Sequence, residues 1–413
     1  MLELDAQDQA LLNGDFGPAA ARAMALLVRY GEAVQAERFI SITSAHIDGC
    51  LYHGPSSIDF VKRFVDLGGG VRVPTTLNVA AVDVTHPERH AGPPYLIAAQ
   101  TELTRLHEDL GCTASLTCAP YHRLIRPHLG DHVAWAESNA IVFANSVLGA
   151  RTDRYGDFTD LCAALTGRAP LCGLHKDENR RPTLVLEAPS LEHSGLTRDL
   201  YFAAIGYAAG EASEGGVPLI EGLPLDTNED EFKTLGAAGA SSGSLALFHA
   251  ADLTPEAEQA QIYVAAAAIP HRFLAEDRLR QIIDNLCPLA LGEQVCAICL
   301  GTPHFSINEF RALARRVNGR TRAKNVAVYV STSRETAAQL QNAPEFSPLW
   351  TFGVEIVVDT CTYVNALKLP GEGAIVTNSA KYAHYGPGNL KRRIGLMSLD
   401  RCLASAVAGH VMP

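Results

Sequence analysis

The sequence lacks three features: a long apolar run, a cluster of basic residues and a nucleotide-binding loop. None of its apolar runs approaches the roughly 18 to 20 residues that span a bilayer. Its first residues, MLELDAQDQ, are acidic where a secretory signal would be basic and then apolar. We therefore expect a cytoplasmic protein with no membrane partner.

Positive charge is scarce. The formal net charge is -11 at pH 7, and the short basic stretches in ENRRP and LKRRIG do not form a cluster. Nucleic-acid-binding domains concentrate Lys and Arg on one face, so nucleic acid is not an expected partner.

The usual loops of nucleotide and hydrolase sites are also missing. The glycines of DLGGGVRV follow a predicted helix and precede a predicted strand, which is the reverse of the order in a dinucleotide-binding fingerprint. The chain has no G-x-S-x-G nucleophile elbow either, since its string GASSG lies within LGAAGASSGS, a predicted small-residue helix. A flavin or NAD oxidoreductase and a serine hydrolase are therefore poorly supported.

Apolar runs of strand length do alternate with segments of helical period. RFISITS is followed by helical SSIDFVKRFVDLGG and then by VRVP, and the strand-like runs SLALFHA, AICLG, NVAVYVS and VEIVVD recur later. In INEFRALARRVNG the apolar residues have helical spacing, and LGAAGASSGS has the small residues of a closely packed helix. Short apolar strands separated by helices predict an α/β fold with a mostly parallel sheet.

One polar segment marks a candidate boundary. The stretch GLHKDENRRPT, residues 173–183, would divide the 413-residue chain into parts 1–175 and 184–413. The same stretch is equally compatible with a single exposed loop.

Ten cysteines are scattered through the chain, a pattern that argues against a disulfide framework. Cys118, Cys299 and Cys361 each lie where an apolar run gives way to polar, turn-forming residues. Ligands of a parallel sheet bind at the carboxyl ends of its strands, so three converging thiolates would make a metal or iron–sulfur site with an open coordination position. The alternative is three separate core residues. Cys296 is interpreted as packing, because residues three apart on a strand point to opposite faces.

Polar clusters at other predicted strand ends would suit a small polar substrate. They are TSAHIDG, VPTTLN, WAESNAIVFANSVLGARTDR and TNSAKYAHYGPG. Glu137 and Ser138 open a predicted helix, where a simple capping role is the alternative. Lys381 and Arg151 are candidates for binding a carboxylate or phosphate, although single cations are often merely solvated.

Several of these strings together resemble one family. TCAPY, the WAESNA segment, VPTTLN, FHAADLTPEA, LGTPHFS, DTC and TNSAKYAHY, spread over nearly the whole chain, resemble the large subunit or large domain of aconitase X. The resemblance implies an aconitase-like α/β fold, with mostly parallel sheets flanked by helices, in a multi-domain large subunit without the swivel domain. It also implies a hydro-lyase, or dehydratase.

The resemblance further implies an iron–sulfur cluster held by Cys118, Cys299 and Cys361, with one iron open to the hydroxyl and carboxylate of a small hydroxy acid. Archaeal members resemble GCPH where this chain has GTPH at 301–304, so the middle cysteine is displaced to Cys299. The type of cluster is therefore open, and a mononuclear iron is an alternative.

The matching motifs also supply the expected site residues. Those implied for catalysis are Ser44, His46, Glu137, His304 and Lys381, and those implied for substrate contacts are Thr75, Thr76, Asn78, Ser138 and Asn145. For His304, a structural role in the GTPH turn is the alternative.

A swivel-domain segment like LSFWGG is absent. The resemblance therefore implies a separate small swivel subunit that supplies a catalytic serine as the base. The CLGTPHFS variant resembles the bacterial branch, which removes water from cis-3-hydroxy-L-proline to give Δ1-pyrroline-2-carboxylate. The alternatives are a phosphomevalonate dehydratase of the same family and a non-catalytic subunit with a structural metal site.

Overall fold

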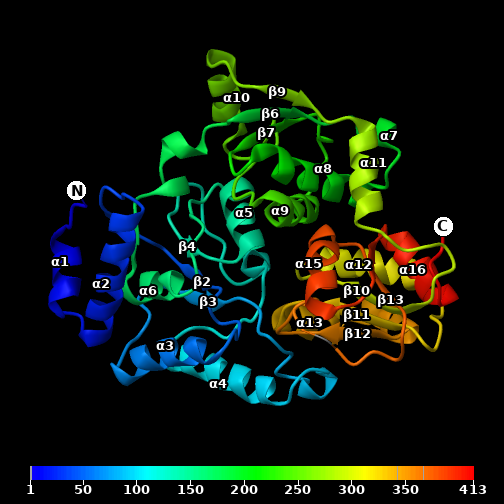
Figure 1. Ribbon diagram of the computed structural model, residues 1–413, viewed down its shortest axis with the longest axis horizontal. Coiled ribbons are helices and arrows are strands. Elements are labelled where there is room, and N and C mark those ends of the chain that lie inside the picture. Colours follow the sequence, from blue (N-terminus) through cyan, green and yellow to red (C-terminus); the bar gives the residue numbers. More distant parts are fainter. Residues whose placement is uncertain (1, 342, 366) are drawn as a thin grey trace. The chain divides into compact units, whose positions relative to one another are not determined.

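The computed structural model describes residues 2–341, 343–365 and 367–413. The chain divides into two compact units, and Figure 1 labels many of their elements. Unit 1 comprises residues 1–84, 93–181 and 254–256, and unit 2 comprises residues 85–92, 182–253 and 257–413. The passage from Arg181 to Pro182, where the chain enters the main part of unit 2, lies within the polar segment 173–183.

Unit 1 is built around a small parallel sheet with the strand order β3-β2-β4, beside an antiparallel pair of β1 and β5. Buried apolar residues such as Leu27, Leu103 and Leu161 pack the helices into one core. Its elements are α1 (Ala6–Asn13), α2 (Pro18–Ala33), β1 (Phe39–Ser41), β2 (Ala45–Ile47), α3 (Pro55–Asp66), β3 (Thr75–Leu77), α4 (Tyr95–Asp109), η2 (Pro120–His122), β4 (Ala134–Trp135), α5 (Ser138–Ser146), α6 (Thr159–Thr166), β5 (Arg168–Pro170), η3 (Gly173–His175) and η4 (Asp177–Arg180).

Unit 2 contains two parallel sheets. The first has four strands in the order β8-β7-β6-β9. Its elements, with η1 (Pro87–Arg89), are β6 (Leu184–Glu187), α7 (Leu191–Ser194), α8 (Arg198–Ser213), β7 (Pro218–Glu221), α9 (Glu229–Gly243), β8 (His249–Ala250), α10 (Ala257–Ala266), β9 (His271–Phe273) and α11 (Glu276–Asn285).

The second sheet of unit 2 has five parallel strands in the order β12-β11-β10-β13-β14. Its buried strands form a core with apolar residues of α12, α14 and α16, among them Phe310, Leu349 and Leu403. Its elements are β10 (Val295–Leu300), α12 (Ile307–Val317), β11 (Ala327–Ser331), α13 (Arg334–Gln341), η5 (Pro344–Phe346), α14 (Ser347–Phe352), β12 (Val354–Val357), β13 (Ala374–Thr377), α15 (Ala380–Leu390), β14 (Ile394–Leu396) and α16 (Leu399–Ala408).

Helices α8 and α9 lie side by side in Figure 1 and approach closely because small residues line their contact. A Cβ added at Gly210 would lie only 2.3 Å from the carbonyl oxygen of Gly239. The small-residue stretch LGAAGASSGS therefore forms a closely packed helix, as the sequence predicts.

The predicted α/β class with mostly parallel sheets is confirmed, as is the helix within INEFRALARRVNG, which runs over Ile307–Val317. The strand predicted at VRVP is wrong, since β3 begins at Thr75. The amides of Val71 and Arg72 donate to the carbonyl oxygens of Leu110 and Ala164, each at 2.8 Å, instead of to a neighbouring strand.

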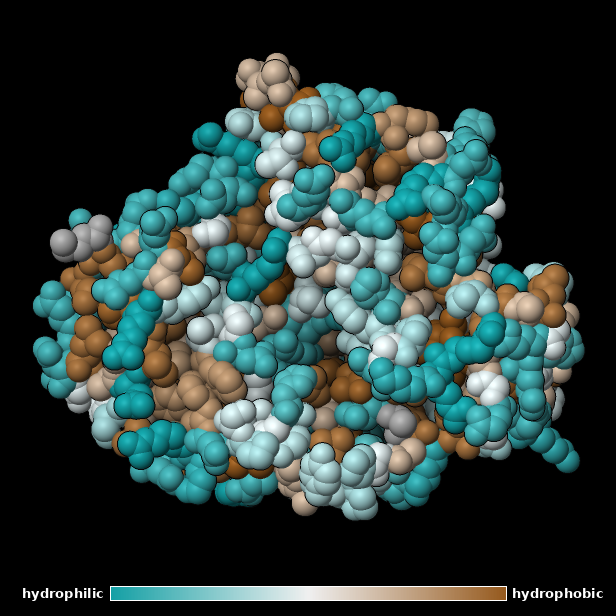
Figure 2. Space-filling view, viewed as in Figure 1, coloured by the Kyte–Doolittle hydropathy of each residue, from teal (hydrophilic) through white to brown (hydrophobic). Residues whose placement is uncertain are grey.

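The face shown in Figure 2 carries many hydrophilic residues with hydrophobic ones between them. Among the described residues, no helix is both long enough and apolar enough to cross a membrane.

Candidate functional site

The turn after β10 requires a glycine. Gly301 has a φ of 84°, and a Cβ there would lie 2.1 Å from the carbonyl oxygen of Ser331 at the end of β11. Only glycine combines this backbone conformation with such a close approach. The chain can therefore turn sharply after β10 and continue into His304.

His304 is completely buried in unit 2. Its Nε2 lies 3.3 Å from the carbonyl oxygen of Thr360, and its own carbonyl oxygen accepts a hydrogen bond from Lys233 Nζ at 3.2 Å. A carbonyl oxygen can only accept, so Nε2 carries the proton of this hydrogen bond. In that tautomer Nδ1 carries the lone pair, which is the form of imidazole that binds a metal ion.

Cys361 lies in the loop after β12 and is also buried. The preceding Asp359 has a φ of 67°, and its fully buried carboxylate receives two hydrogen bonds from Arg334 and one from Thr85. These bonds fix the loop that presents Cys361. The prediction that polar residues around this cysteine form a turn at a strand end is thus explained by specific contacts.

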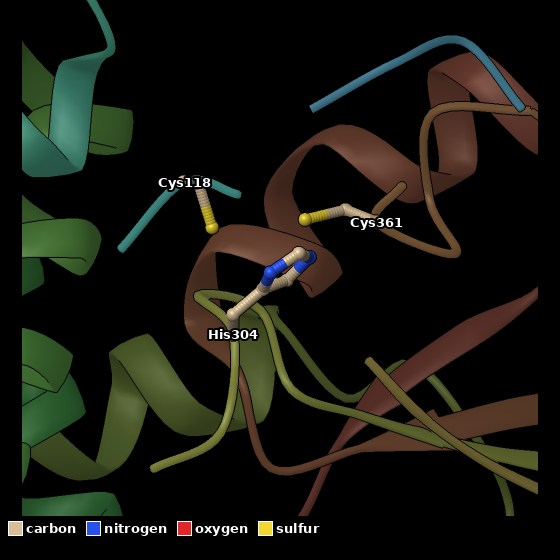
Figure 3. A group of neighbouring side chains, drawn as sticks. All are labelled: Cys118, His304 and Cys361. Carbon is tan, nitrogen blue, oxygen red and sulfur yellow. The ribbon is translucent and has the colours of Figure 1, made fainter. Parts of the chain in front are cut away.

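The His304 and Cys361 side chains lie close together in unit 2 (Figure 3), with a ring nitrogen and the sulfur within 4.8 Å of each other. Imidazole nitrogen and thiolate sulfur are both ligands for zinc and iron. The pair is therefore the core of a candidate metal centre.

Cys299 is not part of this pair. It lies within β10, opposite Tyr329 of β11, and its thiol is buried. Burial raises the pKa of Cys299 to about 11. The structure thus places His304, rather than Cys299, beside Cys361, because the turn at Gly301 carries the chain beyond the strand to the loop at Thr360.

Cys296 makes packing contacts, as its position on the strand suggests. Its sulfur lies 3.4 Å from the carbonyl oxygen of Gly373, on the neighbouring β13 side of the sheet.

Unit 1 presents Cys118 at the carboxyl end of its own parallel sheet. The Thr117 amide donates to the carbonyl oxygen of Leu77, the last residue of β3, at 3.2 Å. The Asn139 amide donates to the carbonyl oxygen of Cys118 at 3.1 Å, and the cysteine itself is buried. Cys118, also labelled in Figure 3, is thus held beside the carboxyl end of β3, although its own segment, residues 112–118, forms no strand.

The same edge of unit 1 gathers predicted polar residues. His46 of β2 has its Nδ1 2.8 Å from Thr76 Oγ1 of β3, and its buried Nε2 has no hydrogen-bond partner among the described residues. Burial lowers the pKa of His46 to about 4, although the nearby Glu137 carboxylate opposes this shift. Because β2, β3 and β4 are parallel neighbours, their carboxyl ends bring His46, Thr76 and Glu137 together.

Sequence reasoning missed Asp48, which directly follows β2. The Asn78 amide donates a hydrogen bond to its carboxylate. Burial, with Glu137, Asp157 and Asp160 nearby, raises the pKa of Asp48 to about 8. Asp48 could have been predicted from TSAHIDG, since an acidic residue immediately after a strand lies at the same edge of the sheet as His46.

Five predicted residues of unit 1 have structural contacts. Ser44 accepts from the Trp135 indole at 3.2 Å, and Thr75 donates to the Val73 carbonyl oxygen at 2.8 Å. Asn145 exchanges hydrogen bonds with Thr152 and accepts one from Arg180. The remaining contacts belong to the start of α5, where Ser138 donates to Glu137 and Glu137 caps the helix by accepting from the Ala140 amide at 2.6 Å.

Lys381 lies in the first turn of α15 in unit 2 and is buried. It lines a small cavity of about 20 Å³ together with Lys233, Thr302, Glu309 and Ser379. Thr302 Oγ1 is buried there without a partner among the described residues. A cavity of this size and polarity holds a water molecule or one end of a small polar group.

Family models for the first, second and third domains of aconitase X match residues 1–178, 182–283 and 295–408. The chain belongs to the aconitase X family. The resemblance noted in the sequence is thereby confirmed.

Named relatives of this aconitase X chain are dehydratases. It is 41% identical to the cis-3-hydroxy-L-proline dehydratase of Pseudomonas aeruginosa, covering 98% of this chain and 70% of that protein. It is 40% identical to the dehydratase of the same name from Hypocrea jecorina, covering 99% of this chain and 69% of that protein. It is 31% identical to the phosphomevalonate dehydratase large subunit of Methanocaldococcus jannaschii, over 97% of this chain and 99% of that one.

A solved structure of the family has the same fold. The crystal structure of Thermococcus kodakaraensis aconitase X in its holo-form matches with a TM-score of 0.84 and 28% sequence identity, covering 98% of this chain and 100% of that one.

The donor atoms of this aconitase X chain fit a metal or iron–sulfur centre. A buried thiol and an imidazole that hydrogen-bonds through its other nitrogen form the pair in unit 2. Such an outer hydrogen bond to a carbonyl oxygen is the usual support of a metal-binding histidine.

Proposed function

We propose that this chain is the metal-binding large part of a hydro-lyase that removes water from cis-3-hydroxy-L-proline to give Δ1-pyrroline-2-carboxylate. The observation that carries the proposal is the 41% identity to the Pseudomonas aeruginosa dehydratase over 98% of the chain. The phosphomevalonate dehydratase large subunits are 31% to 33% identical. We expect the protein to act in the cytoplasm.

The proposed ligands of the metal are Cys118, His304 and Cys361. His304 replaces Cys299 in this set because it is the residue whose ring lies beside Cys361. Cys118 is added from unit 1 because it is buried at a strand end that carries other polar site residues. An iron or iron–sulfur centre held by these residues would supply a Lewis acid for the departing hydroxyl group.

The chain's own polar residues bind and orient the substrate. Lys381 offers a cation for the substrate carboxylate at the start of α15, where the helix dipole also favours negative charge. His46 and Thr76 form a hydrogen-bonded pair at the strand ends of unit 1, and Glu137 is held by the first turn of α5. These groups suit the ring nitrogen and hydroxyl of a hydroxyproline better than a phosphate, which would require several cations.

A separate small swivel subunit is proposed to supply the serine base. The chain spans 70% of the Pseudomonas aeruginosa dehydratase but 99% of the Methanocaldococcus jannaschii large subunit. The proposal is supported by the similarity to the Methanocaldococcus jannaschii protein, which is named as the large subunit of a dehydratase.

A second candidate function, the dehydration of phosphomevalonate, is favoured by the 31% identity to the Methanocaldococcus jannaschii large subunit over 97% of this chain. The two functions are separated by assaying the anaerobically reconstituted chain, mixed with its small subunit, with each substrate in turn. Turnover of cis-3-hydroxy-L-proline supports the main proposal, and turnover of phosphomevalonate alone overturns it. A zinc-loaded protein that is inactive on both after iron reconstitution would indicate a structural metal site.

A further inference from the structure

Lys233 of α9 is a fully buried cation that none of the site motifs includes. It is only 1% exposed and has three partners, all within unit 2. It forms ion pairs with Glu309 and with Asp230, the latter at 3.2 Å, and it donates to the carbonyl oxygen of His304 at 3.2 Å. Since an ammonium group has three donors, each of them has an acceptor here.

The two carboxylates of this cluster also hold the chain directly after His304. Asp230 accepts from the Ser306 hydroxyl at 2.8 Å, and Glu309 accepts from the Ser306 amide at 2.8 Å. One ionic cluster therefore binds the segment 304–306 at both of its ends, at His304 and at Ser306. Its direction, and hence the direction of the His304 ring, depends on that cluster.

The hydrogen bond from Lys233 takes the place of a backbone hydrogen bond that a helix or strand would supply to this segment. Residues 301–306 belong to no helix or strand, so their carbonyl groups need partners from side chains. Ser379 and Thr332 satisfy the carbonyl oxygens of Thr302 and Phe305, and Lys233 satisfies that of His304. The charged donor is thus directed at the residue that carries the imidazole.

We propose that Lys233 is a positioning residue that sets the His304 imidazole for metal binding, an inference that rests on the proposed metal centre. A buried ion pair is often no more stabilising than apolar residues of the same volume, so stability alone is a weak reason for placing a lysine here. Positioning a ligand is a specific use for its third donor. Lys233 would act through the backbone of His304 without contacting substrate.

The test compares K233M with R168M, which removes a matched buried cation from unit 1. Arg168 is 4% exposed and is paired with two aspartates, Asp5 and Asp8. Each full-length variant is loaded anaerobically with Fe²⁺, and the rate of iron loss to a chelator is followed together with the thiolate-to-iron absorption. Melting of the metal-free proteins is recorded in parallel.

We expect K233M to lose iron about 10- to 100-fold faster than the parent chain, the usual range for loss of an outer-shell contact. R168M should lower the melting temperature of the metal-free protein and leave the iron-loss rate unchanged. If K233M does not fold, the double variant K233M/E309Q, which also removes one uncompensated carboxylate, should show the same accelerated loss.

Equal iron-loss rates in the parent chain and the folded Lys233 variant would overturn the positioning role while leaving the proposed function intact. A parent chain that takes up no iron at all would overturn both, and this result is recognised before any variant is compared.

Discussion

At the scale of single residues, the site depends on which side chain follows a strand and how the next turn directs it. Cys118 and Cys361 could be located from sequence because polar, turn-forming residues follow apolar runs. The position of His304 beside Cys361 could not be predicted from sequence, because it depends on the sharp turn at Gly301 and on the hydrogen bond between His304 and Thr360. Sequence spacing favoured Cys299, whose thiol remains within β10.

Substituting the two rival ligands separately should decide between them. We expect H304A to lower iron affinity by more than about 100-fold, beyond the range of outer-shell substitutions, because it removes a ligand. C299S should change iron affinity less than about tenfold. Iron and sulfide content after anaerobic reconstitution, with chelator competition, gives the measurement.

C402S is the control for this comparison, since Cys402 is a buried cysteine of α16. It should keep the parent's iron content. Loss of iron in C299S with full retention in H304A would restore the ligand set expected from sequence.

The buried Asp48 carboxyl predicts a pH dependence of stability. Its pKa is raised from 3.8 to about 8, mainly by burial. Between these values the unfolded chain is ionised while the folded chain keeps the proton, so rising pH favours unfolding. We expect D48N to raise the free energy of unfolding at pH 7.5 by about 1 kcal/mol or more, since one pKa unit corresponds to 1.36 kcal/mol. Urea unfolding of the metal-free chain at pH 5, 6, 7 and 8 provides the measurement.

In this series the difference in the free energy of unfolding between D48N and the parent chain should grow from pH 5 to pH 8. The exposed Asp66 pairs with Lys62 on α3, and D66N should show no comparable trend. A difference that is constant across the pH range would refute a protonated Asp48 in the folded state.

At the scale of elements, the spacing of apolar residues was sufficient to predict long helices and insufficient to predict short strands. The helix Ile307–Val317 follows from the spacing of its apolar residues and its Ser306 cap. The apolar residues of VRVP suggested a strand, yet hydrogen bonds to Leu110 and Ala164 occupy its first two amides. Such tertiary competition for amides is not encoded in local spacing.

The close contact between α8 and α9 gives a prediction at this scale. In G210A the new methyl group would meet Ser242 Oγ at 2.1 Å and the Gly239 carbonyl oxygen at 2.3 Å. Forcing the helices apart should cost about 1–3 kcal/mol, as overpacked cores do. Thermal and urea unfolding of the metal-free protein measure the change.

G388A provides the matched control in α15, because a Cβ at Gly388 meets no atom within 4 Å. There alanine should stabilise the helix by roughly 0.5–1 kcal/mol. Equal effects of the two substitutions would contradict the close approach of α8 and α9.

At the scale of the whole molecule, the family was predictable because its motifs recur in order along the chain, and the family models match three successive parts of it. The class of fold followed from the alternation of strands and helices. The composition of the candidate metal centre was less accessible, since residues distant in sequence are brought together by turns such as that at Gly301 and by hydrogen bonds such as that between His304 and Thr360.

The separate swivel subunit that we propose predicts that metal binding and turnover can be separated. The chain alone should bind iron, and its iron–thiolate absorption should shift on addition of cis-3-hydroxy-L-proline, because the proposed ligands and substrate-orienting residues belong to this chain. Its turnover should be about 100-fold or more below that of the mixture with the small subunit, since a positioned general base contributes about 10²–10⁴ in rate. Anaerobic assays of Δ1-pyrroline-2-carboxylate formation, with the small subunit titrated to saturation, measure this difference. Full turnover by the chain alone would show that the base belongs to this polypeptide, and His46 and Glu137 would then be the first groups to substitute.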